Sequence, residues 1–323
     1  MYNTKLDIQF NIFIIMINYH HYNKNMALNI ILLVSIIIIM ILVPVLLCVF
    51  CIPDNKIPPP PESYTTTKIL NPKIPYLLHK TGPHTIESIP AVLSSAMKRS
   101  ANHLACDIKY YDDDDCVRLI RDNFEPKVLK AYNMLRPTAF KADLFRYCCL
   151  YLHGGVYSDI GHTIIKDYQI NQDNVDMILV KDKNAGKSCK TQISFMATIP
   201  KNNFYKYIID NIVQDIHDKK YGRNCLDITG PDAFGRYFEM FFNIKSIGDD
   251  FKVPTKFTGL DDKIYNIVIP YEQKGSTSLV DRYNNADIFI VTKVPNYGKV
   301  VYDDINKRKH YGSLWHNREV YID

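Results

Sequence analysis

Two carboxylates and one guanidinium lie close together near the middle of this sequence. Asp143 and Arg146 are three residues apart, so on a helix they share one face and can be presented together to one ligand. Asp159 directly follows residues 156–158, which read as a short buried strand. Because ligands of open α/β sheets bind at the carboxyl ends of strands, this arrangement indicates a site for a polar ligand. The alternative interpretation is a surface ion pair followed by a tight turn.

The flanking residues predict the elements that position these groups. Pro137 is typical of a helix start, and apolar residues recur at spacings of three and four as far as about His153. Gly154 and Gly155 then end the helix ahead of the strand. A helix-to-strand turn is therefore expected to hold all three charged groups.

The stretch from Lys141 to Gly161 resembles the glycosyltransferases with a DXD sugar-binding region, the family-32 group of mannosyltransferase-like enzymes. Their pattern is K-A-D-x-x-R-Y, a double glycine, an aromatic residue and D-x-D. Four further segments are similar to motifs of this family and occur in the same order, so the resemblance extends from about residue 70 to residue 316. They are Ile74-Pro75-Tyr76-Leu77-Leu78-His79-Lys80-Thr81, Tyr111-Asp112-Asp113-Asp114-Asp115, Thr229-Gly230-Pro231 and His310-Tyr311-Gly312-Ser313-Leu314-Trp315.

The resemblance implies a binding site for a nucleotide-sugar donor. Asp143 and Arg146 would hold the hydroxyl groups of the donor sugar. Asp159 would bridge the sugar or the ribose to a metal ion. His79 and Thr81, at the end of the first strand, would lie near the nucleotide base or ribose.

The reaction of this family explains why such residue types are needed. Sugar transfer breaks the anomeric C–O bond while negative charge builds on the departing diphosphate, so groups that stabilise that charge matter most. Ser313 and Trp315 would close over the diphosphate as a carboxyl-terminal lid and donate hydrogen bonds to it; a half-buried surface aromatic is the alternative for Trp315. The resemblance also implies retention of configuration, in which the diphosphate itself can take the proton, so no general base is nominated.

The expected metal site departs from the family pattern. The family holds a divalent ion, usually manganese, with both carboxylates of D-x-D, and hard oxygen ligands suit that ion. Here Gly161 stands in place of the second aspartate. Three explanations stay open: the ion is held by Asp159, His162 or His310 with water and phosphate; Lys or Arg replaces the ion; or the domain binds sugar nucleotide without turning it over.

The resulting main hypothesis is a membrane-anchored glycosyltransferase. It would move a sugar, with mannose as one candidate, from a GDP- or UDP-sugar to a glycan or glycolipid acceptor. The alternative, motivated by Gly161, is a non-catalytic membrane protein that binds a sugar nucleotide or glycan. A metal-dependent phosphohydrolase built on Asp112–Asp115 is disfavoured, because consecutive aspartates point to different helix faces. That acidic run instead predicts a helix cap.

Apolar periodicity predicts alternating strands and helices. The expected fold is an α/β sandwich with a mostly parallel central sheet, compatible with the GT-A fold that the resemblance implies. Strands are expected at 74–79, 108–111, 156–158, 177–180, 194–198, 264–269, 288–291 and 300–302, and helices at 90–102, 117–123, 126–135, 138–153, 204–217 and 232–242.

The amino-terminal part predicts a membrane anchor. Residues 30–52 are almost wholly apolar and uncharged, and spanning a bilayer needs roughly 20 apolar residues. The alternative interpretation of residues 30–52 is a cleaved signal peptide. The apolar region of a signal peptide is only about 7–15 residues long, so this segment is too long for one. We expect a cytosolic segment 1–29, a signal-anchor helix 30–52, a proline-rich stem 53–68 and a glycosyltransferase domain 69–323. This single-pass type II topology places the domain in the lumen of the Golgi, the endoplasmic reticulum or a host endomembrane system. Met26 is an alternative start to Met1.

The charge and the cysteine content bear on which kinds of binding site the protein can have. The net charge of +5 is spread over 323 residues with basic and acidic side chains intermixed, so nucleic-acid binding has no special support. The six cysteines of the expected domain lack zinc-ligand spacing. Free buried thiols are the default, and Cys106–Cys116 and Cys189–Cys225 disulfides are the alternative if the domain is lumenal.

Overall fold

The computed structural model describes residues 68, 71–171, 174–182, 188–245, 255–272, 278–280, 288–294 and 309–322; within these, the side chains of 271–272, 278–280 and 288–292 are not described. The chain divides into two units, Met1–Lys56 and Ile57–Asp323, and all described residues belong to the second. The expected segments 1–29 and 30–52, nearly all of the stem 53–68 and the strand 300–302 lie outside the described residues. In the described part, no helix is both long and apolar enough to cross a membrane.

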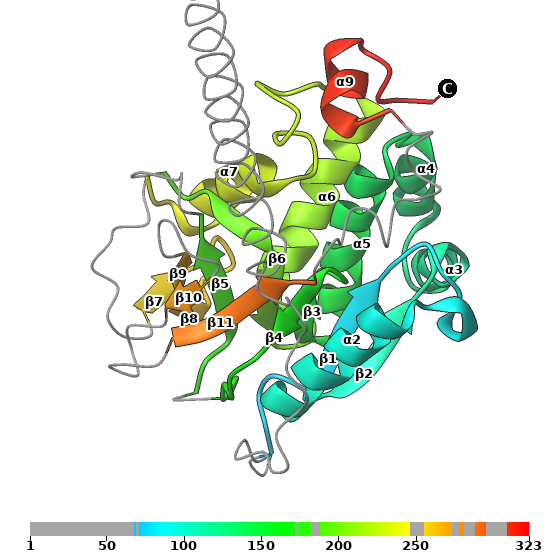
Figure 1. Cartoon of the computed structure of the whole chain (residues 1–323). Coiled ribbons are helices and arrows are strands. Elements are labelled where there is room, and N and C mark those ends of the chain that lie inside the picture. Colours follow the sequence, from blue (N-terminus) through cyan, green and yellow to red (C-terminus); the bar gives the residue numbers. More distant parts are fainter. Residues whose placement is uncertain are drawn as a thin grey trace, which may run out of the picture. The chain divides into compact units, whose positions relative to one another are not determined.

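In the described part of the second unit, runs of helices and runs of strands follow one another along the chain (Figure 1), so the expected alternation holds only near its start, from β1 to α3. Its elements are β1 Leu77–Thr81, the short 3₁₀ helix η1 Ile86–Ser88, α2 Ala91–Leu104, β2 Asp107–Tyr111, α3 Asp113–Asn123, α4 Pro126–Met134, α5 Thr138–His153, β3 Gly155–Ser158, β4 His162–Ile164, β5 Met177–Lys181, β6 Thr191–Thr198, α6 Asn203–His217, α7 Pro231–Phe242, β7 Thr255–Thr258, β8 Ile264–Val268, β9 Tyr271–Glu272, β10 Ser278–Val280, β11 Ile288–Lys293 and α9 Tyr311–His316.

The described strands form one mixed sheet in the order β2-β1-β3-β6-β5-β9-β10-β11-β4, with β8 joined to β5 and β7 joined to β8. Strand β1 pairs in parallel with β2 and β3, and β5 in parallel with β8 and β9. The other six pairings among the described strands, β3–β6 and β5–β6 included, are antiparallel. The α/β class is therefore confirmed, but the expectation of a mostly parallel sheet is wrong.

The chain connections between the strands explain why parallel and antiparallel pairings occur in one sheet. A long crossover through α3, α4 and α5 brings β3 back beside β1 in parallel, whereas a short connection between β5 and β6 leaves them antiparallel. Apolar periodicity reports which faces of a strand are buried, and it carries no information on the direction of the neighbouring strand. Strands β4, β7, β9 and β10 were not expected, and each has four residues or fewer.

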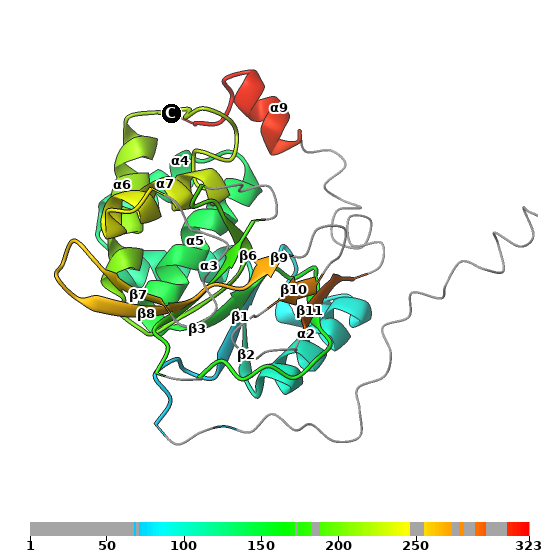
Figure 2. The ribbon, with the colours of Figure 1, turned by 90° about the vertical axis from the view of Figure 1, so that its left-hand side faces the viewer.

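Helices cover both faces of the sheet (Figure 2). Alternate residues of β3 divide between the two sides: Val156 joins the apolar cluster that includes Leu104 of α2, and Tyr157 joins the larger cluster built from α3 to α7. Strand β6 behaves likewise, with Ala197 in the first cluster and Met196 in the second. The site-bearing helix α5 is thus packed into the larger of the two apolar layers.

The turn between α5 and β3 requires glycine twice. Gly154 and Gly155 have φ angles of 60° and 86°, in the left-handed region that side chains disfavour. A Cβ on Gly154 would lie 2.5 Å from the nitrogen of Pro200, and one on Gly155 would lie 2.7 Å from the carbonyl oxygen of Leu77. The predicted helix end is therefore confirmed. The tight turn lets β3 begin at Gly155, two residues after α5 ends at His153.

The acidic run before α3 is a helix cap, as predicted. The Asp112 carboxylate accepts a hydrogen bond from the Asp115 amide at 2.8 Å, and the Asp115 carboxylate accepts one from the Asp112 amide at 3.3 Å. These two bonds form a capping box and satisfy two amides at the helix start. The six cysteines of the domain are free thiols in the structure. Five are buried, as the default interpretation expects, and Cys225 is half-buried.

Phe204, at the start of α6, lies at the centre of the aromatic packing between α6 and α7. It is fully buried, and its ring contacts five other aromatic rings, those of Tyr205, Phe234, Phe238, Phe241 and Phe242. Phe204→Ala is expected to lower the free energy of unfolding by about 3–5 kcal/mol, because the truncation leaves a cavity. Chemical denaturation measures this loss. Met240→Ala on α7, where the side chain is half exposed, is the control and should cost far less; equal losses would contradict the central role of Phe204.

Candidate functional site

The three predicted charged groups meet where α5 lies against the end of β3. The Arg146 guanidinium is 2.9 Å from the Asp143 carboxylate, one helical turn earlier, and 3.5 Å from the Asp159 carboxylate, which follows β3. A surface ion pair is excluded, because the side chains of Asp143 and Arg146 are only 12% and 7% exposed. The Asp159 side chain is 36% exposed, so it is the member of this charged cluster that a ligand can reach most directly.

Two further contacts fix the direction of the guanidinium. It stacks over the ring of Tyr157, 4.7 Å from the ring centre, and it donates a hydrogen bond of 2.6 Å to the carbonyl oxygen of Ile193 on β6. A planar guanidinium can satisfy these partners and the carboxylates at the same time, whereas an ammonium cannot. Arg146 is thus held rigidly between α5, β3 and β6.

Thr229, just before α7, belongs to the site, whereas its sequence motif predicted only a helix start. Its hydroxyl donates to the second Asp143 carboxylate oxygen at 2.9 Å, and its carbonyl accepts from the Tyr147 hydroxyl at 2.8 Å. Burial raises the pKa of Asp143 to about 6, although Arg146 and the Thr229 hydroxyl both lower it. The Thr229-Gly230-Pro231 segment was the available signal for this role, since its family resemblance marks the position.

The structure places His79 and Thr81 on the strand next to β3. Both ring nitrogens of His79 already have partners, the Gly154 carbonyl at 2.9 Å and the Tyr111 hydroxyl at 3.1 Å, and the side chain is fully buried. Burial lowers the pKa of His79 to about 4, so it is neutral at pH 7. Thr81 shares a hydrogen bond of 3.1 Å with the Tyr157 hydroxyl and so lies directly beside the ring that supports Arg146.

The carboxyl-terminal helix α9 contains Ser313 and Trp315 and follows His310. The Trp315 indole donates at 2.7 Å to the carbonyl of Tyr221 in the α6–α7 loop, and His310 caps α9 by accepting from the Gly312 amide at 3.1 Å. The Tyr311 ring lies 5.7 Å from that of Phe140 near the start of α5. Helix α9 therefore rests on the amino-terminal end of the helix that bears the charged cluster. The contacts of the described residues do not join Ser313 or Trp315 to the cluster itself.

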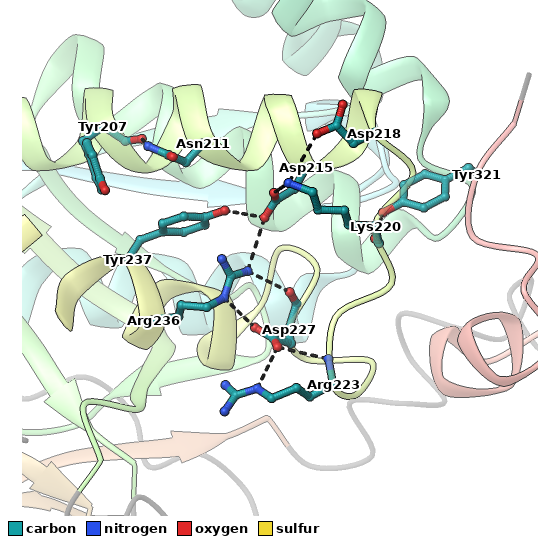
Figure 3. A network of polar contacts seen from close by, with 10 residues as sticks. All are labelled: Tyr207, Asn211, Asp215, Asp218, Lys220, Arg223, Asp227, Arg236, Tyr237 and Tyr321. Carbon is teal, nitrogen blue, oxygen red and sulfur yellow. Dashed lines mark hydrogen bonds and ion pairs between the residues drawn. The ribbon is translucent and has the colours of Figure 1, made fainter. Parts of the chain in front are cut away.

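A polar network holds the α6–α7 loop, residues 218–230, in place (Figure 3). Asp215 of α6 accepts hydrogen bonds from Tyr237, from Arg236 at 3.3 Å and from Lys220 at 2.7 Å. Asp227 of the loop accepts from Arg236 at 3.1 Å and from the side chain and amide of Arg223 at 2.9 and 3.1 Å. The loop that delivers Thr229 to Asp143 is therefore anchored to both of its flanking helices.

The charged cluster falls inside a region shared with known proteins. Residues 88–184 match the family described as glycosyltransferase sugar-binding region containing DXD motif. These residues are a glycosyltransferase sugar-binding region. The family resemblance found in the sequence is thereby confirmed for the segment that holds Asp143, Arg146 and Asp159.

Two curated proteins that are similar to this chain are also named as glycosyltransferases. An uncharacterized glycosyltransferase of Acanthamoeba polyphaga mimivirus is 30% identical over 139 residues, which cover 42% of this chain and 47% of the relative. The initiation-specific alpha-1,6-mannosyltransferase of Candida albicans is 38% identical over 84 residues, 25% of this chain and 22% of that enzyme. The chain thus spans less than half the length of these curated relatives. A solved structure, the PaToxG glycosyltransferase, aligns at 14% identity and a TM-score of 0.41 over 53% of this chain and 71% of that one.

The candidate metal ligands named from the sequence are Asp159, His162 and His310. Among the described residues, no group of three His, Cys, Asp or Glu side chains is placed to hold an ion. Gly161 offers no side chain, and His310 uses its Nδ1 on the cap of α9. His162 is buried with a pKa lowered by burial to about 4, and its Nδ1 has no partner. The described side chains therefore do not fit a manganese ion held by protein ligands alone.

The free energy of unfolding is expected to depend on pH because Asp143 titrates at a different pKa in the folded and unfolded states. Its pKa of about 6 lies above the ordinary value of 3.8, so its contribution is fully present below pH 3.8 and is lost as the pH rises through about 6. The difference in unfolding free energy between wild type and Asp143→Asn should therefore fall from pH 4 to pH 7, as measured by urea denaturation. Asp122→Asn is the control, because the Arg121 hydrogen bond lowers the pKa of Asp122. A flat difference for Asp143→Asn would contradict the burial argument.

Proposed function

We propose that this chain transfers a sugar from a nucleotide-diphosphate sugar to a glycan or glycolipid acceptor. The observation that carries the proposal is the Arg146 guanidinium clamped between Asp143 and Asp159 inside the sugar-binding region. A sugar presents hydroxyl groups that both donate and accept hydrogen bonds. The partly exposed Asp159 carboxylate would accept from them, and Arg146 would orient that carboxylate and donate to the ligand.

The site supports the donor half of the reaction better than any acid–base role. Asp143 has both oxygens engaged, one by Arg146 and one by Thr229, so it serves to hold the guanidinium. The proposed stereochemistry is retention, in which the departing diphosphate accepts the acceptor's proton and no protein base is required. Mannose is the proposed sugar and GDP-mannose the first donor to test, because the Candida albicans relative is named as a mannosyltransferase; UDP-sugars are the second choice.

The proposed setting is a membrane. The uncharged apolar segment 30–52 would anchor the chain with its amino terminus in the cytosol, and the proline-rich stem would hold the transferase domain in an endomembrane lumen. A glycolipid or membrane-bound glycan would then lie within reach of the domain. Protease protection of the domain in sealed microsomes tests this arrangement.

One observation favours a second candidate, a protein that binds a sugar nucleotide without turning it over. Gly161 removes a carboxylate from the D-x-D pattern, and the described side chains make no three-ligand metal site. The two candidates share the donor site and differ only in turnover.

The deciding experiment is a donor screen on the full-length chain. Thermal shift with GDP- and UDP-sugars, with and without manganese, reports binding because a bound donor stabilises the folded state. Donor hydrolysis and transfer to glycan acceptors report turnover under the same conditions. Binding with turnover supports the transferase, binding without turnover supports the second candidate, and absence of binding by all common donors overturns both.

A further inference from the structure

Lys80 of β1 is a buried cation beside the charged cluster. Its side chain is fully buried, and its ammonium donates to three oxygens: the Ser158 hydroxyl at 3.2 Å, the Asp159 carbonyl at 2.9 Å and the His162 carbonyl at 3.0 Å. An ammonium has three protons, so this hydrogen-bonding capacity is fully used. Burying a charge is costly unless it is paired in this way, so these three acceptors are what allow a lysine to occupy the site.

All three acceptors belong to one short segment, residues 158–162, which we call the Asp159 turn. The turn is closed by a hydrogen bond of 2.9 Å from the His162 amide to the Asp159 carbonyl, and its start is fixed to β6 by the Asp159 amide, which donates to the Ser194 carbonyl at 3.0 Å. The ammonium joins both ends of the turn from the interior, at Asp159 and His162. Gly161 lies between those ends and has no side chain with which to hold them.

The position of the turn decides where the second carboxylate lies. Asp159 projects from the turn toward the Arg146 guanidinium at 3.5 Å, and about a third of its side chain is open to a ligand. Lys80 itself is wholly enclosed and cannot touch that ligand. Its influence must therefore pass through the backbone of the turn to the carboxylate.

We propose that Lys80 is a positioning residue for the donor site, which holds the Asp159 turn so that the Asp159 carboxylate stays aligned with Arg146 and available to the donor sugar. This inference rests on the proposed donor-binding function. Without the ammonium, the carbonyls of Asp159 and His162 lose their shared partner, and the turn is held less tightly. A misplacement of about 1 Å at a binding group can cost on the order of a hundredfold.

The test compares Lys80→Met, which keeps the length of the side chain and removes the charge, with Lys73→Met. Lys73 makes an ion pair with the largely buried Asp176, away from the Asp159 turn, so its loss is a matched structural control. For Lys80→Met we expect donor Kd and donor KM to rise by about ten- to a hundredfold while acceptor KM stays unchanged. Lys73→Met should alter thermal stability and leave all three constants unchanged, because a purely structural loss reduces the amount of folded protein and not its affinity.

The outcomes separate this inference from the proposed function. If wild type binds no donor, the proposed function fails. If wild type binds donor and folded Lys80→Met binds it with unchanged Kd, the positioning role alone is overturned. If Lys80→Met does not fold, Ser158→Ala decides, because it removes one of the three acceptors: a donor Kd raised about threefold or more supports the role, and an unchanged Kd overturns it.

Discussion

Arg146→Lys will weaken donor binding by about a hundredfold while the protein remains folded at room temperature. The guanidinium contacts Asp143, Asp159 and the Ile193 carbonyl at once and lies flat on the Tyr157 ring. Lysine keeps the charge but, as a single ammonium, can neither bridge the two carboxylates nor stack on the ring. A hundredfold loss of affinity corresponds to about 2.7 kcal/mol of binding free energy. Isothermal titration with the donor found by screening gives the measurement.

A matched control isolates the geometry of this one arginine. Arg121 of α3 is exposed and pairs with the neighbouring Asp122 at 2.7 Å, so Arg121→Lys should leave donor affinity within about twofold of wild type. Wild-type affinity in Arg146→Lys would show that charge alone suffices at this position. The clamp between the two carboxylates would then not be the donor-binding feature.

Asp159→Asn is expected to reduce kcat/KM for transfer by about a hundred- to a thousandfold with little loss of stability. The substitution keeps the shape of the side chain and removes the charge that faces both Arg146 and the open side of the site. Because the side chain is about a third exposed and its ion pair is long at 3.5 Å, the expected change in unfolding free energy is below about 1 kcal/mol. Steady-state kinetics and thermal unfolding on the same preparation measure the two quantities.

The two readouts together distinguish a binding carboxylate from a structural one. Asp227 is the comparison, since its carboxylate is buried and accepts from Arg223 and Arg236 in the α6–α7 loop. Asp227→Asn should therefore lower stability more than Asp159→Asn does. An Asp159→Asn variant that destabilises the fold but transfers sugar at the wild-type rate would assign Asp159 to the architecture instead of the donor site.

Local signals in the sequence were sufficient to predict helix α5 and the turn into strand β3. Apolar spacing and the two glycines predicted α5 and its end at His153, and the residue pattern alone placed the three charged groups together. The acidic cap of α3 was equally local, because a capping box is complete within four residues. Such features need no knowledge of distant neighbours.

The missed features all depend on pairs far apart in the chain. Lys80 meets Ser158 across 78 residues, and Thr229 meets Asp143 across 86. Strand direction likewise depends on how connections cross the sheet, which is why the mostly parallel sheet was a wrong expectation. A single sequence carries no record of such pairings. Lys80 stands between His79 and Thr81 in a strand that is polar at its end, so nothing local marked it as buried.

The anchored α6–α7 loop has a consequence for local unfolding of the protein. Near one end it gives the Tyr221 carbonyl to Trp315 of α9, near the other it gives the Thr229 hydroxyl to Asp143, and between them Asp227 is fastened to Arg223 and Arg236. A segment tied at several points opens as one cooperative unit and not residue by residue. Opening of this loop as a whole would therefore release two contacts together, that of the Tyr221 carbonyl with the carboxyl-terminal helix and that of the Thr229 hydroxyl with Asp143.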